Sequence, residues 1–255
     1  MHSIRDVVRN AWNGFLNLLF PARTRCLLCG TETEGTYLCQ VCEGKVSIID
    51  GVPRCSRCSR PLIAEERFCP SCSRGEKIHF DRAVAPCTYD GIIVNMIRSF
   101  KFKRRSDYAH YFAELMFGAS RLLPAFDVVV PVPTKASTLR QRGYNQCDLL
   151  GKSLCSHLKV PFCTVLKRTD DAREQVGLTG EERRRNVEGT VKVVNGNAVS
   201  GKRVLVVDDV LTTGATVSEC ARVLKRAGAL DVYAIAVAIA PTKVLNGETG
   251  EITSV

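Results

Sequence analysis

Over residues 82–242, short apolar runs alternate with longer amphipathic segments. Three runs lack the alternating polar positions of a half-exposed strand, which is typical of parallel strands buried on both faces: Asp127–Pro133, Arg203–Asp209 and Val232–Ala240. Two segments show helical spacing of apolar residues: Cys147–Leu158, and Thr216–Gly228 with its terminal glycine. Strands that alternate with helices predict an α/β domain, with a mostly parallel sheet flanked by helices.

Other patterns divide the rest of the chain. Residues 1–22 place apolar side chains at helical spacing, which predicts an N-terminal amphipathic helix. Residues 23–76 form a cysteine-rich module, and residues 243–255 are polar and expected to be frayed. Within the main domain, the pair Asn195-Gly196 predicts a hairpin turn between two strands.

The apolar runs are too short to cross a bilayer, because none reaches about 18 residues. The N-terminal residues also lack an apolar run that ends in a small-residue cleavage site, so we do not expect a secretory signal. We therefore expect the protein to be cytoplasmic.

Cysteine is far more frequent than in an ordinary chain, with 13 residues among 255. Eight of them form Cys-x-x-Cys pairs, a spacing typical of zinc ligands in a reducing compartment. Sequential pairing gives two zinc ribbons with short loops, whereas a cross-braced arrangement takes alternate pairs; we favour the first. It predicts two structural Zn²⁺ sites, formed by Cys26, Cys29, Cys39 and Cys42 and by Cys55, Cys58, Cys69 and Cys72. The other five cysteines, Cys147 among them, are expected to be inert small hydrophobic residues.

Two adjacent aspartates end the run Arg203–Asp209, and a loop rich in threonine leads from them into the next helix. A helix N-terminus offers unpaired N–H groups and a positive dipole end to a phosphate. Carboxylates repel a phosphate, but they accept hydrogen bonds from neighbouring hydroxyl groups. A ribose 5-phosphate carries both features. We therefore expect Asp208 and Asp209 to bind the ribose hydroxyls, and the phosphate to lie on Thr212, Thr213, Gly214, Ala215 and Thr216.

The segment Val204–Thr216 resembles the signature of type I phosphoribosyltransferases, which is a hydrophobic strand, Asp-Asp and then Thr-Thr-Gly-x-Thr. The resemblance implies the type I phosphoribosyltransferase fold and binding of phosphoribosyl diphosphate (PRPP), with Mg²⁺ held on its pyrophosphate. It also implies a catalytic part for Asp208 and Asp209, whose carboxylates would stabilise positive charge on the sugar in the transition state.

Two further segments, Asp127–Gln146 and Gln175–Val191, resemble the ComF family, as does the cysteine module. Members of that family join a zinc module to a phosphoribosyltransferase domain and act in competence and DNA utilisation. The resemblance implies a pyrophosphate loop at Thr134 and Lys135. It also implies a cleft bordered by Arg140, Arg142, Gly143, Asn145 and Gln146.

A basic tract precedes the main strands and interleaves cations with aromatic residues. Its cations are Lys101, Lys103, Arg104 and Arg105, and Tyr108 and Tyr111 follow. Such interleaving suits single-stranded DNA, and the net charge of +10 suits a polyanionic partner. An amphipathic helix with solvated lysines explains the tract equally well, and Lys101 and Lys103 can instead reach the PRPP cleft.

These patterns together predict a PRPP-binding protein of the ComF type that acts in DNA uptake or utilisation and binds single-stranded DNA. The family resemblance also implies a helicase-like partner. The alternative is an active phosphoribosyltransferase of nucleobase or nucleotide salvage, which the intact PRPP motif supports. No acceptor-base pocket is recognisable in the sequence.

Overall fold

The computed structural model describes residues 23–62, 66–73, 78–103, 105–169, 187–241, 243–245 and 252–254. The chain divides into two units, Met1–Val46 and Ser47–Val255. The predicted N-terminal helix over residues 1–22 lies outside the described residues. None of the described helices is both long and apolar enough to cross a bilayer.

The first unit is a small zinc ribbon. Strands β1 (Arg23–Arg25) and β2 (Glu32–Glu34) pair antiparallel, and the short helix α2 (Gln40–Glu43) follows. Apart from its cysteines, Leu38 and Val46 are the only hydrophobic residues buried in the described part of this unit. A core this small cannot stabilise a fold, so the four cysteines of the first cluster must do so through a metal.

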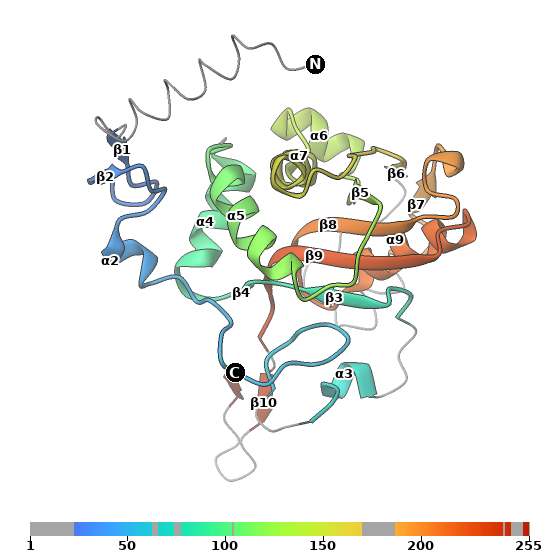
Figure 1. The fold of residues 1–255 in the computed structure, drawn as a ribbon, viewed down its shortest axis with the longest axis horizontal. Coiled ribbons are helices and arrows are strands. Elements are labelled where there is room, and N and C mark those ends of the chain that lie inside the picture. The colour runs from blue at the N-terminus through green and yellow to red at the C-terminus, as the bar shows by residue number, and fades with distance from the viewer. Residues whose placement is uncertain are drawn as a thin grey trace, which may run out of the picture. The chain divides into compact units, whose positions relative to one another are not determined.

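A parallel sheet forms the centre of the second unit (Figure 1). Its strands lie in the order β3 (Arg82–Val84), β9 (Asp231–Ile239), β8 (Arg203–Leu211) and β5 (Val128–Pro131), and β4 (Cys87–Thr88) also pairs with β9. Every one of these pairings is parallel. The fold class predicted from the apolar runs is therefore confirmed.

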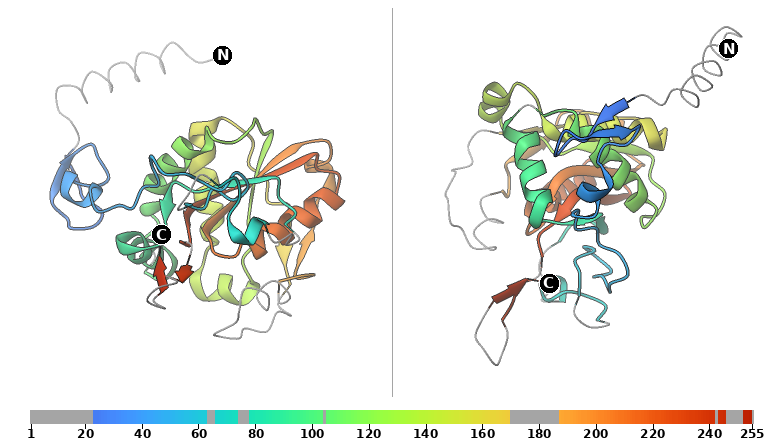
Figure 2. Two further views of the ribbon diagram at one scale, coloured as in Figure 1. Left: turned by 90° about the horizontal axis from the view of Figure 1, so that it is seen from below. Right: turned by 90° about the vertical axis from the view of Figure 1, so that its left-hand side faces the viewer.

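Helices cover the sheet and bury both of its faces (Figures 1 and 2). Helix α9 (Ala215–Arg226) packs on the face of β8 that carries Val204 and Val206. Leu205 and Val207 point to the other face because side chains alternate along a strand, and they are fully buried as well. Helices α4 (Gly91–Phe102), α5 (Tyr108–Ser120), α6 (Ala136–Arg142) and α7 (Gln146–Leu158) complete the unit, with short α3 (Pro70–Ser73) in the second ribbon.

The structure differs from two expectations about the main domain. Strand β8 does not end at the acidic pair; it continues to Leu211, which pairs with Ile239 of β9. The predicted hairpin at Asn195-Gly196 is wrong. Strand β7 (Val191–Val193) pairs instead with β6 (Leu166–Arg168), and Gly196–Ala198 forms a 3-10 turn, η1.

Backbone conformation explains why the hairpin signal failed. A two-residue type I′ turn needs positive φ at both central residues, but Asn195 has φ of −146°. Val199, just beyond the turn, is fully buried in the core. Burial of this side chain therefore outweighs the local turn preference. In the tail, for which we expected fraying, β10 (Lys243–Leu245) pairs antiparallel with β11 (Ile252–Ser254).

The second zinc ribbon belongs to the same unit as the sheet. Cys55, Cys58 and Cys69 are buried in one hydrophobic cluster with Phe80 and Ala83, which lie just before and within β3. The predicted cysteine module is thus divided between the two units, and its second half is part of the core of the second unit.

Candidate functional site

The acidic pair lies in the carboxyl-terminal half of β8, and side chains from two helices meet it there. Lys101, in the last turn of α4, places its Nζ 2.7 Å from Oδ1 of Asp209. Both side chains of this ion pair are largely shielded from solvent, with exposures of 23% and 12%. Oδ1 of Asp208 accepts a hydrogen bond from the N–H of Asp209 at 2.8 Å and one from Sγ of Cys147, on α7, at 3.6 Å.

Burial and like charge set the electrostatics of this group. Burial, together with the charge of neighbouring Asp209, raises the pKa of Asp208 to about 7, although Lys101 opposes the shift. Burial lowers the pKa of Lys101, but the charge and hydrogen bond of Asp209 and the charge of Asp208 together outweigh it and leave that pKa above its ordinary value. Burial also raises the pKa of the Cys147 thiol, which therefore stays neutral. A proton can thus be gained or lost at Asp208 near neutral pH.

The predicted phosphate loop joins β8 to α9. Gly214 takes a left-handed conformation, with φ of +74°, at the N-cap of the helix. A Cβ added at Gly214 would lie 3.4 Å from the Phe80 ring, so the residue also allows close packing. Within the loop, the N–H of Ala215 donates to Oγ1 of Thr213 at 3.3 Å. The first N–H groups of a helix have no partners inside it, so this loop has the donors that a phosphate needs.

The turn predicted as the pyrophosphate loop follows β5. Oγ1 of Thr134 donates to Oδ1 of Asn145 at 2.8 Å, and Lys135 is the N-cap residue of α6. Oδ1 of Asn145 also accepts the N–H of Cys147 at 3.1 Å and thereby caps α7, while its Nδ2 donates to the carbonyl of Val132 at 3.1 Å. Thr134 and Asn145 thus hold the turn to the helix that carries Cys147.

Of the predicted cleft residues, Arg140 is exposed, whereas Arg142 and Gln146 make contacts within the protein. Gly143 ends α6 with φ of +84°. The guanidinium of Arg142 lies 4.5 Å from the centre of the Phe102 ring and donates to Oε1 of Gln146 at 3.2 Å. Gln146 is only 2% exposed, and its Nε2 donates to the carbonyl of Lys101 at 3.4 Å. Arg142 and Gln146 therefore attach α4, and with it Lys101, to the rest of the site.

The structure separates the residues of the basic tract, which we expected to bind single-stranded DNA. Lys101 pairs with Asp209 and faces the acidic pair, as the alternative interpretation allowed. Tyr108 and Tyr111 are buried in the contact between helices, so they cannot stack on bases. Arg105 forms an ion pair with Asp107 at 2.7 Å, Arg104 lies outside the described residues, and Lys103 is exposed. Phe100, Tyr108 and Tyr111 belong to the core because they follow the inner faces of α4 and α5, whereas Phe102 is 65% exposed.

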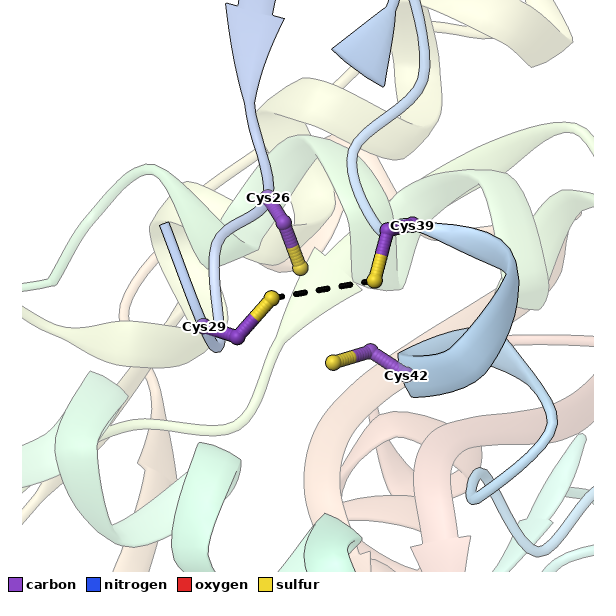
Figure 3. A group of neighbouring side chains, drawn as sticks. All are labelled: Cys26, Cys29, Cys39 and Cys42. Carbon is purple, nitrogen blue, oxygen red and sulfur yellow. Dashed lines mark hydrogen bonds between the residues drawn. The ribbon is translucent and has the colours of Figure 1, made fainter. Parts of the chain in front are cut away.

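The eight predicted zinc ligands form two clusters, paired as we expected from sequential pairing. Tetrahedral zinc with Zn–S bonds of about 2.3 Å places its sulfur ligands roughly 3.8 Å apart. In the first cluster Cys29 and Cys39 have their Sγ atoms 3.7 Å apart (Figure 3), and in the second Cys58 and Cys69 are 3.6 Å apart. Both clusters thus fit structural zinc. Each already has four thiolate ligands, so neither leaves an open position for catalysis.

The structure also shows site residues that the sequence did not reveal. Cys147, expected to be inert, lies beside Asp208, and no local pattern distinguishes it from the other scattered cysteines. Tyr144 donates from its hydroxyl to the carbonyl of Phe100 and so joins the turn after α6 to α4. Arg60, in the second ribbon, donates from Nη2 to the carbonyl of Thr212 at 2.6 Å.

Comparison with known proteins gives matches over most of the chain. The double zinc ribbon domain matches residues 15–73, and the phosphoribosyl transferase domain matches residues 124–249. Competence protein F of Haemophilus influenzae is 29% identical over 218 residues, 82% of this chain and 93% of that protein. DNA utilization protein YhgH of Salmonella typhi is 31% identical over 216 residues, 81% of this chain and 93% of that protein.

Comparison with solved structures gives matches over about half of the chain. Glutamine PRPP amidotransferase from B. subtilis, complexed with ADP and GMP, is 20% identical. That match covers 51% of this chain and 26% of the amidotransferase, with a TM-score of 0.37.

Proposed function

The chain belongs to the ComF family of competence and DNA-utilisation proteins, and on that premise we propose that it binds PRPP and acts in DNA uptake or utilisation. In this proposal Asp208 and Asp209 bind the ribose hydroxyls, and the loop Thr212–Thr216 binds the 5-phosphate. Mg²⁺ enters with the pyrophosphate, for which the turn at Thr134 and Lys135 is our candidate site.

One observation carries this proposal: the acidic pair and the phosphate loop lie on a single strand–loop–helix segment. Strand β8 fixes Asp208 and Asp209, and α9 directs its free N–H groups into the loop that follows. Strand β5 pairs with β8 from Val128–Val204 to Pro131–Val207, so the turn after β5 leaves the same edge of the sheet. Ligands of parallel sheets bind at this carboxyl-terminal edge.

Lys101 fits the same proposal. Its Nζ neutralises Asp209 across 2.7 Å. Ribose hydroxyls would take over part of this role by donating hydrogen bonds to the acidic pair. The Nζ group would then lie beside the polyanionic ligand, where a positive charge is favourable.

The proposal includes single-stranded DNA and a helicase-like protein as partners, and a cytoplasmic location. Support comes from the formal charge of +10 and from relatives named for competence and DNA utilisation. Because Tyr108 and Tyr111 are buried, the contact we propose depends on phosphate charge, with Lys103 as an exposed cation among the described residues of the tract.

An active phosphoribosyltransferase is the second candidate function. The acidic pair supports it, because two carboxylates close to the sugar would stabilise the positive charge that develops as pyrophosphate leaves. Release of pyrophosphate from PRPP in the presence of individual nucleobases tests for turnover. A base-dependent release would establish it, and release no faster than without protein would exclude it for those bases.

The test of PRPP binding is calorimetric titration of the zinc-loaded protein with PRPP and Mg²⁺. We expect the double variant Asp208→Asn/Asp209→Asn to lose binding, because amides are weaker acceptors for the ribose hydroxyls. The matched control is Asp127→Asn, which removes a carboxylate paired with Arg203 away from the loop. Zinc content and circular dichroism check that each variant is folded. Equal affinity in the double variant and the wild type would overturn the assignment.

The DNA contact is tested by the salt dependence of single-strand binding. Lys103→Ala should weaken binding and reduce the slope of log affinity against log salt by about 1, as loss of one phosphate contact requires. Lys167→Ala removes an exposed lysine from β6 and serves as the control. An unchanged slope in the Lys103 variant would remove this tract from the proposal.

A further inference from the structure

The second zinc ribbon is joined to the phosphate loop by a charged side chain. Arg60 follows the second cysteine of the first Cys-x-x-Cys pair in this ribbon. Its Nη2 donates a hydrogen bond of 2.6 Å to the backbone carbonyl of Thr212, the first residue of the loop. The ribbon and the loop belong to the same unit, although these two residues are 152 positions apart.

Further contacts attach the same ribbon to the elements around the loop. The carbonyl of Arg57 accepts the N–H of Ala83 on β3 at 2.7 Å, and Nη2 of Arg57 donates to the carbonyl of Ile78 at 3.1 Å. The N–H of His79 donates to Oγ of Ser218 on α9 at 3.0 Å. The segment between the ribbon and β3 therefore contacts the helix that follows the loop, while Arg60 of the ribbon contacts the loop itself.

Arg60 ends a tight turn that carries two of the zinc ligands. The turn begins at Cys55, and Ser59 within it has φ of 61° and donates its N–H to the carbonyl of Cys55 at 2.8 Å. The N–H of Cys55 in turn donates to the carbonyl of Arg60 at 2.9 Å. This turn wraps the sulfur atoms of Cys55 and Cys58, so zinc bound to them fixes the backbone of Arg60.

The charge of Arg60 has no acidic partner among the described residues. Its Nε is buried and lacks a hydrogen bond within that part of the chain. Arg60 lines a pocket together with Cys58 and Cys72 of the ribbon and with Thr212, Thr213 and Gly214 of the loop. An uncompensated guanidinium next to a loop with free N–H groups favours an anion on that loop.

We propose that Arg60 is a positioning residue for the phosphate loop, and that zinc in the second ribbon and PRPP on the loop strengthen each other's binding. The inference rests on the proposed PRPP site. Zinc holds Arg60, Arg60 holds the carbonyl of Thr212, and the loop keeps its N–H groups directed at the phosphate. Binding free energies are reciprocal, so PRPP on the loop must strengthen zinc binding in the second cluster by the same factor as zinc strengthens PRPP binding.

The first test is zinc release from the full-length protein into a chromogenic chelator, with and without PRPP and Mg²⁺. Two release phases are expected, and PRPP should slow one of them by about tenfold. Loss of this protection in Arg60→Ala would assign the protected phase to the second ribbon. Equal protection of both phases, or of neither, would overturn the inference.

The second test is PRPP affinity in matched arginine variants. Arg60→Ala should weaken binding by about tenfold, the effect of losing one charge-assisted hydrogen bond. Arg60→Lys keeps a charged donor and should recover part of the loss, which a merely structural role would not predict. Arg67→Ala removes an exposed arginine of the same ribbon that lies over the Phe68 ring, and should bind as the wild type does.

The two proposals fail in different ways. If the wild-type protein does not bind PRPP, the proposed function itself is wrong. If the wild type binds PRPP, and Arg60→Ala binds it equally well and shows the same zinc protection, only the role of Arg60 is wrong.

Discussion

Asp208→Asn should change how the stability of this protein depends on pH. The pKa of Asp208 is raised to about 7, mainly by burial and then by the charge of Asp209, from an ordinary value of 3.8. Between these two pH values the folded protein holds a proton at Asp208 that the unfolded chain has lost. The contribution of protonated Asp208 to the free energy of unfolding is therefore at its full value below pH 3.8, and it is lost as pH rises to about 7.

The size of the effect follows from the two pKa values. Linkage predicts that the free energy of unfolding of the wild type falls by about 3 kcal/mol between pH 5 and pH 8. Asparagine does not titrate, so the variant should not show this fall. Because Asp208 is only half-buried, solvent screening lowers the figure, and we expect about 2 kcal/mol. The amide oxygen can still accept from the N–H of Asp209 and from Cys147, so the local hydrogen bonds persist.

The assay is urea unfolding of wild type and variant at pH 5 and pH 8 with excess zinc. Zinc release adds its own pH dependence, which cancels when the two proteins are compared at each pH. The free energy of unfolding of the variant, relative to that of the wild type, should be about 2 kcal/mol higher at pH 8 than at pH 5. Asp127→Asn provides the control. Hydrogen bonds with Arg203 lower the pKa of Asp127 to about 2, so its contribution to stability is lost only as pH falls from 3.8 toward 2. The Asp127→Asn variant should therefore follow the wild type between pH 5 and pH 8. Parallel pH curves for Asp208→Asn and wild type would refute the reasoning.

Three other predictions concern Lys101, the packing at Gly151 and the zinc clusters. Lys101→Met removes the charge that lowers the pKa of Asp208, so the pH midpoint of PRPP binding should move upward; an unmoved midpoint would contradict the ion pair's role. A Cβ at Gly151 would lie 2.6 Å from the Phe162 ring, so Gly151→Ala should cost about 1–3 kcal/mol in thermal unfolding, whereas Gly118→Ala has open space and should cost nothing. Elemental analysis should give about two zinc ions per chain, as two closed four-thiolate clusters require, and a single zinc would exclude one of them.

Features encoded by neighbouring residues could be predicted from the sequence. Strands β5, β8 and β9 appear as continuous apolar runs because both faces of the sheet are covered. The zinc clusters follow from Cys-x-x-Cys spacing, and the phosphate loop follows directly from the strand before it. In each case the chemistry lies within a few residues of chain, where spacing determines geometry.

Features that depend on packing between distant segments could not be predicted. Lys101 meets Asp209 because α4 is held by Arg142 and Gln146, and none of these contacts has a local signal. The aromatic residues of the basic tract looked like stacking platforms, but the helices bury Tyr108 and Tyr111. The attachment of the second ribbon to the sheet likewise appears only when the chain is folded.

The central claim is that a PRPP site and a DNA-handling function share one protein. Its most direct test is calorimetric titration of the zinc-loaded protein with PRPP and Mg²⁺, without and with single-stranded DNA. We predict that PRPP binds and that DNA changes its dissociation constant at least about fivefold, the lower end of typical coupling between two binding sites. PRPP binding that DNA leaves unchanged would contradict the claim and favour an enzyme of salvage, and the absence of PRPP binding would contradict the site itself.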